Sequence, residues 1–169
     1  RAAAITIDDG YRSTYSVAYP ELKRFGLPAS VFLATDFVDG GRLLWTDRVE
    51  YAVSRGARDA LEVTIGTESV CLELRDRASR IAADRYLRSR LKALAQESRD
   101  EAVDAIERAA GCSASDGAEL YEPLRWSEAS EMAGSGLVSI GSHTHTHVIL
   151  ARCEPARIAH ELHTSKRII

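Results

Sequence analysis

The chain carries three short, largely apolar runs, at residues 2–7, 29–33 and 137–140. Short continuous apolar runs are typical of strands that are buried within a parallel sheet. A segment with helical features follows each run, and this alternation predicts strand–helix units joined by right-handed crossovers. We therefore predict an α/β fold built around a parallel sheet.

Two prolines indicate where helices begin. Residues 12–25 contain Pro20, so we predict a short helical turn and then a helix that starts near this proline. Pro155 is equally well placed to begin the last helix. In that helix we expect an apolar stripe facing the core, formed by Ile158, Ala159, Leu162 and Ile169. His160 and His163 are then expected at the surface.

Residues 54–125 interrupt the strand–helix pattern. Alternation over 62–65 and 70–74 around a Gly-Thr pair predicts a β-hairpin. Apolar residues recur at helical spacing over 75–96, and 98–110 reads as a second helix capped by its first serine. We interpret this part as a mainly helical insertion of a hairpin and helices, whose many charges lie on solvated helix faces.

Three of the five histidines, His143, His145 and His147, directly follow the third apolar run. They lie where a strand ends, which is where α/β folds place their chemistry, and imidazole is the commonest protein metal ligand. An extended segment would put all three on one face, whereas a helical turn would pair only His143 with His147. We favour the helical turn, because two imidazoles, a carboxylate and water complete a four-coordinate catalytic site. An accidental cluster in a polar loop is the plainer alternative.

The first run ends in adjacent acids, Asp8 and Asp9, before Gly10. Neighbouring carboxylates after a strand can divide two tasks, one binding a cation and the other holding a proton. The plainer alternative is a simple turn, since acids and glycine are common turn formers.

Residues 6–11 (Thr-Ile-Asp-Asp-Gly-Tyr) and 142–147 (Ser-His-Thr-His-Thr-His) resemble the first two motifs of the polysaccharide deacetylases. These are the NodB-type homology domains of carbohydrate esterase family 4. The resemblance extends to about residue 53 and resumes at 124–127. It implies a distorted (β/α) barrel. A complete barrel takes ~250 residues. We therefore expect residues 1–169 to form a partial catalytic domain, which consists of the N-terminal part of the barrel with the insertion at 54–125.

The resemblance also implies roles for individual residues. Asp9, His143 and His147 correspond to the ligands of a divalent metal, with Zn²⁺ preferred over Co²⁺ or Ni²⁺, and Asp8 corresponds to the general base. His145 fills a free position of the motif, so we expect it to be a bystander or a supporting residue. The implied reaction is metal-dependent hydrolysis of acetyl groups, as amides or esters, on an acetylated polysaccharide or oligosaccharide. No substrate-binding residue is identified.

The family's later motifs, an Arg- and Pro-containing segment and a histidine that acts as general acid, have no match in the chain. We therefore expect a fragment that is weakly active or inactive on its own. Two alternatives are a non-catalytic carbohydrate-binding or scaffold domain, which would not need Asp8, and another metal hydrolase such as an amidohydrolase. In the latter a His-x-His pair should end the first strand, whereas Asp8 and Asp9 end it here.

Composition and charge limit the classes of partner that we expect for the chain. Hydrophobic residues make up 45% of the chain and charged residues 28%, which is ordinary for a globular protein. The net charge of −3 gives no electrostatic reason to expect nucleic acid as a partner, and no apolar stretch approaches the ~20 residues of a membrane span. Three scattered cysteines do not describe a disulfide framework or a thiolate zinc site. No signal peptide is visible, and an extracytoplasmic or envelope location is expected only from the resemblance.

Overall fold

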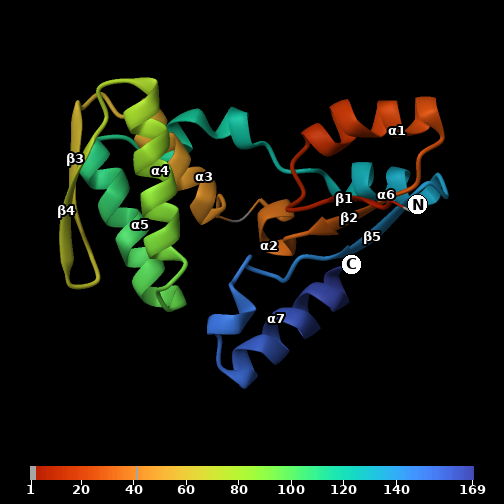
Figure 1. Cartoon of the computed structure of the whole chain (residues 1–169). Coiled ribbons are helices and arrows are strands. Elements are labelled where there is room, and N and C mark those ends of the chain that lie inside the picture. Colours follow the sequence, from red (N-terminus) through yellow and green to blue (C-terminus); the bar gives the residue numbers. More distant parts are fainter. Residues whose placement is uncertain (1–2, 41) are drawn as a thin grey trace. The chain divides into compact units, whose positions relative to one another are not determined.

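The computed structural model describes residues 3–40 and 42–169, which divide into two compact units (Figure 1). The first unit comprises the N-terminal segment through Arg42 together with Tyr121–Val148 and Glu154–Ile169. The second comprises Leu43–Leu120 and Ile149–Cys153.

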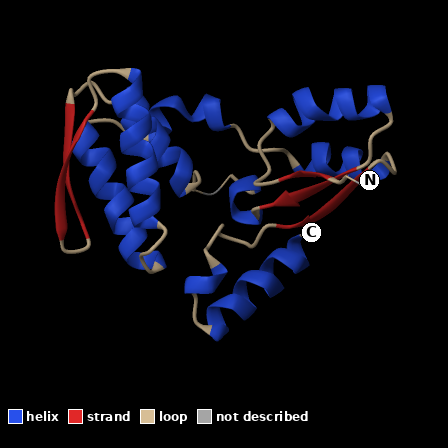
Figure 2. Ribbon diagram, viewed as in Figure 1, coloured by secondary structure: helices blue, strands red, loops and turns tan. Residues whose placement is uncertain are grey.

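A three-stranded parallel sheet forms the centre of the first unit (Figure 2). Its strands are β1 (Ile5–Ile7), β2 (Ala29–Leu33) and β5 (Val138–Ser142), in the order β1-β2-β5. Ile7 pairs with Val31, which in turn pairs with Ile140, so the three strands run in register toward the same edge. The predicted α/β class and parallel sheet are confirmed, although the start of the first apolar run lies outside the described residues.

Helices of the first unit follow the strands, as predicted. After β1 come a π-helical turn, η1 (Thr14–Ala18), and α1 (Tyr19–Phe25), which has Pro20 in its first turn. Helix α1 ends at Gly26, whose left-handed φ of 60° few other residues adopt at low cost. The other helices of this unit are α2 (Thr35–Val38), α6 (Trp126–Gly134) and α7 (Pro155–Ile168). The buried core includes Val31, Leu33, Leu124 and Met132, all fully inaccessible.

Helix α7 begins at Pro155 as predicted, but its predicted apolar stripe is wrong. Leu162 and Ile169 are 43% and 45% exposed. The fully buried side chains of α7 are Glu161 and Ser165, one helical turn apart. The inward face of this helix is therefore polar, while His160 and His163 are exposed as expected.

The second unit is an antiparallel hairpin packed with helices. It contains α3 (Trp45–Arg55), β3 (Ala60–Ile65), β4 (Glu68–Glu73), α4 (Arg77–Leu91), α5 (Gln96–Ala110), and the 3₁₀ segments η2 (Ala114–Tyr121) and η3 (Leu150–Arg152). The predicted hairpin and both long helices are confirmed. Helix α5 begins two residues before Ser98, so the predicted serine cap is wrong. The interpretation of 54–125 as an insertion stays a prediction.

Trp45 and Asp47, at the start of α3, are both buried, and Trp45 belongs to the apolar core of the second unit.

Within the part of the chain that the structure describes, no helix combines the length and the apolarity that a membrane crossing requires.

Candidate metal centre

The chain turns sharply as it leaves β1, and this turn presents Asp9. Asp9 and Gly10 have left-handed φ values of 74° and 99°. A Cβ atom at Gly10 would lie 2.8 Å from Val38 Cγ2 and 3.1 Å from Leu33 Cδ2, so the turn leaves room only for glycine. The carbonyl of Asp9 accepts a hydrogen bond from the Ala34 amide at 3.0 Å, which fixes the turn to the end of β2. Asp9 thus lies at the carboxyl edge of the sheet.

The histidine segment after β5 is a loop, so the predicted helical turn is wrong. Thr144 and His147 adopt left-handed φ values of 67° and 56°. These reversals, rather than helical periodicity, bring the rings of His143 and His147 close together, tilted by 38° with centroids 5.1 Å apart. Among the described residues, the non-glycine residues with positive φ are Asp9, Thr144 and His147. Such backbone strain concentrates at functional sites.

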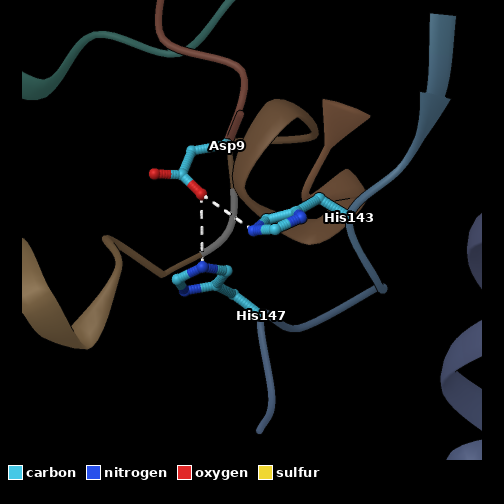
Figure 3. Close-up of side chains that lie close together, drawn as sticks. All are labelled: Asp9, His143 and His147. Carbon is cyan, nitrogen blue, oxygen red and sulfur yellow. Dashed lines mark ion pairs between the residues drawn. The ribbon is translucent and has the colours of Figure 1, made fainter. Parts of the chain in front are cut away.

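Asp9, on the turn after β1, faces the imidazoles of His143 and His147 on the loop after β5 (Figure 3). Its Oδ1 is 3.3 Å from His143 Nε2 and 3.2 Å from His147 Nε2. These separations exceed the ~2.7–2.9 Å of a charge-assisted hydrogen bond. They match the edge of a ligand tetrahedron, which is about 3.3 Å for ligands ~2.0–2.1 Å from Zn²⁺.

The three side chains therefore form a group that could hold a metal ion. All three are part-exposed, between 20% and 36%, so one side of the group is open to solvent. Three protein ligands with an open position are the arrangement of catalytic rather than structural zinc sites. The structure brings together Asp9, His143 and His147 as the sequence predicts, and their role as metal ligands stays a prediction.

The electrostatics of Asp9 favour the form that binds cations. Burial on its own raises the pKa of Asp9, but the neighbouring imidazoles of His147 and His143 lower it by more than burial raises it. The pKa of Asp9 therefore lies below its ordinary value, and the carboxylate is ionised at neutral pH, as a metal ligand must be. The buried Nδ1 of His147 has no hydrogen-bond partner among the described residues, so the polar contacts of this ring converge on Asp9.

Asp8 and His145 lie outside this group. Asp8 is exposed on the same turn, and its backbone carbonyl accepts the Gly10 amide at 2.9 Å. The Nδ1 of His145 is 2.8 Å from Thr35 Oγ1, and its ring contacts that of His160, with centroids 6.4 Å apart. His145 thus contacts Thr35 rather than Asp9, and whether it is a bystander or a supporting residue stays a prediction.

One residue that contacts this loop was missed by the sequence prediction. Glu161 of α7 is fully buried and accepts hydrogen bonds from the backbone of His145 and Thr146. Its sequence signal is weak, an acid four residues after Arg157, with which it forms an ion pair at 2.8 Å.

A comparison with protein-family models agrees with the motifs. A family model described as "Polysaccharide deacetylase" matches residues 1–169. Among solved structures, the chain is similar to the BpsB deacetylase domain from Bordetella bronchiseptica, with 20% identity and a TM-score of 0.42. That match covers 98% of this chain and 49% of the other, so this chain spans about half of that chain's length. A comparison with curated proteins finds no match.

Proposed function

The chain belongs to the polysaccharide deacetylase family, and from this premise we propose that it provides the metal centre of a hydrolase that removes acetyl groups from an N- or O-acetylated polysaccharide or oligosaccharide. The observation that carries the proposal is the convergence of Asp9, from the turn after β1, with His143 and His147, from the loop after β5, although β2 separates these two strands in the sheet. A turn or a polar loop alone would not require these side chains to meet.

Each residue of the site has a task in this proposal. Asp9, His143 and His147 hold a divalent cation on the open side of the group. Such a cation, when bound, polarises an acyl carbonyl and lowers the pKa of water. Asp8, exposed on the same turn as Asp9, takes the proton of the attacking water as general base. The products are acetate and a free amine or hydroxyl on the sugar.

The donor set supports Zn²⁺ as the native ion. Two imidazoles and one carboxylate form the kind of ligand set that catalytic zinc sites use, and the oxygen–nitrogen separations of 3.2 and 3.3 Å suit a tetrahedral ion. Co²⁺ and Ni²⁺ accept the same imidazole and carboxylate donors and are the alternatives.

We propose further that the three strand–helix units are the N-terminal part of a distorted (β/α) barrel, into which 54–125 is inserted. In support, β1 and β5 each pair with β2 alone among the described strands, so the sheet has two free edges where further parallel strands could pair. We place the protein outside the cytoplasm or at the envelope, on the basis of its family.

Acetate release tests the function. The purified chain is loaded with Zn²⁺ and incubated at high concentration with N-acetylated and O-acetylated oligosaccharides, and free acetate is quantified. We expect slow release that stops with a chelator, returns with Zn²⁺ and is absent from Asp9→Ala, while the exposed α7 variant His163→Ala retains it. Release that is unaffected by chelation and by Asp9→Ala would overturn the proposal. Glycan binding with no release, in a chain loaded with Zn²⁺, would favour the non-catalytic binding domain.

A further inference from the structure

The carboxylate of Glu161 is fully buried beneath the histidine loop and accepts hydrogen bonds through both oxygens. Oε2 accepts the amides of His145 and Thr146, each at 2.8 Å. Oε1 accepts the Thr146 hydroxyl at 2.7 Å and pairs with Arg157 Nη2 at 2.8 Å. Burial on its own raises the pKa of Glu161, but these hydrogen bonds and the charge of Arg157 outweigh burial. The pKa of Glu161 therefore lies below its ordinary value. Glu161 is therefore an ionised acceptor for the loop.

Backbone hydrogen bonds of the loop show how much depends on this side chain. The amide of His143 donates to the Leu33 carbonyl at 2.8 Å, and that of Thr144 donates to Ser142 Oγ at 3.1 Å. Glu161 accepts the next two amides, so each of the four amides from His143 to Thr146 has an acceptor. Because buried amides without partners are rare and costly, this loop conformation requires an acceptor at the position of Glu161.

The strained backbone points to the same dependence. Thr144 and His147 hold left-handed φ values on either side of the two amides that Glu161 accepts. Successive amides beside a left-handed residue form a concave nest that binds an anion, and here the anion is a side chain of α7. Ser165, one turn along α7, lies 2.6 Å from Ser142 through their hydroxyl oxygens and gives the helix a second contact with the start of the loop.

We propose that Glu161 is a positioning residue of the metal centre: by binding the two central amides of the loop, it holds the imidazoles of His143 and His147 toward Asp9. This inference rests on the proposed function, because it takes these imidazoles as metal ligands. It also explains why α7 buries a carboxylate where an apolar side chain would be expected. Partners that orient ligands in this way typically contribute 10- to 100-fold in metal affinity.

Zn²⁺ affinity, measured by competition with a chromophoric chelator, is the first test. Glu161→Ala is expected to weaken binding about 10- to 100-fold. Glu161→Gln is expected to fall in between, because its amide nitrogen cannot accept a backbone N–H. The matched control is Met132→Ala, a truncation in the buried core of the same unit that destabilises the fold without a described contact to the loop, and its affinity is expected to stay within about twofold. Equal losses in Met132→Ala and Glu161→Ala would overturn the positioning role.

Amide hydrogen exchange on the metal-free protein gives a second readout. In Glu161→Ala, exchange at His145 and Thr146 is expected to accelerate at least about tenfold relative to the β2 amides, whereas Met132→Ala should affect both regions alike. Unchanged exchange at these two amides would overturn the inference even if the wild type binds Zn²⁺. A wild type that binds no Zn²⁺ would overturn the proposed function, and with it the ligand-positioning role, whatever the exchange data show about the loop.

Discussion

Replacing Gly10 by alanine tests whether the turn after β1 is as constrained as its geometry indicates. The new Cβ would lie 2.8 Å from Val38 Cγ2 and 3.1 Å from Leu33 Cδ2, at a φ of 99°. A left-handed φ costs about 1–2 kcal/mol for a residue with a side chain, and overpacking costs about 1–3 kcal/mol more. We therefore expect Gly10→Ala to lower the free energy of unfolding by about 2–5 kcal/mol.

Gly26 provides a matched control. It also has a left-handed φ, 60°, but a Cβ there would meet nothing within 4 Å. Gly26→Ala should therefore show only the backbone cost of about 1–2 kcal/mol. The difference between the two variants isolates the packing cost at Gly10.

Urea unfolding can be followed in the first unit alone, because Trp126 belongs to this unit and Trp45 to the second. In a Trp45→Phe background, the fluorescence of Trp126 reports the transition of interest. Equal destabilisation by Gly10→Ala and Gly26→Ala would refute the argument from the contacts of Val38 and Leu33. An additional loss of Zn²⁺ affinity in Gly10→Ala alone is expected, because Asp9 is the preceding residue.

Three further predictions concern the site. Asp8→Asn should retain Zn²⁺ with unchanged stoichiometry but release acetate at least about 100-fold more slowly, as for loss of a general base, and similar rates would remove Asp8 from that role. His145→Ala should keep Zn²⁺ affinity within about threefold while His143→Ala loses most of it, because His143 faces Asp9 whereas His145 faces Thr35; the reverse order in a metal titration would contradict the assignment. The lowered pKa of Glu161 means that its stabilising contribution is complete above its ordinary value of 4.5 and is lost as the pH falls through the lower folded-state pKa. The free energy of unfolding should thus fall more between about pH 6 and about pH 3.5 in the wild type than in Glu161→Gln, and equal slopes would show that Glu161 is not an ionised acceptor.

The strands and the helix starts could be predicted because short local sequence patterns determine them. The strand at 29–33 coincides with a predicted apolar run and alternates buried with half-buried residues, the strand at 138–142 overlaps the predicted run at 137–140, and Pro20 and Pro155 occupy first helical turns. Because proline has no amide hydrogen and a fixed φ, it fits the first turn of a helix and few other helical positions.

The loop conformation could not be predicted in the same way. The spacing of His143 and His147 favoured a helical turn, but the loop they occupy depends on Glu161, a distant acceptor for the amides of His145 and Thr146. Glu161 lies fourteen residues beyond His147, so no local pattern links the two. The general rule that apolar residues face inward predicted the wrong buried face for α7. Its buried residues are Glu161 and Ser165, because this face contacts the polar backbone of the loop.

The most direct test of the central claim is a Zn²⁺ titration with metal analysis of the dialysed protein, on the wild type and on Asp9→Ala, His143→Ala and His147→Ala. One equivalent of Zn²⁺ bound by the wild type, and lost in all three variants while the exposed His163→Ala retains it, is the predicted result. A wild type without bound Zn²⁺, or one whose Zn²⁺ survives removal of Asp9 and of both histidines, would contradict the claim that this group is a metal centre.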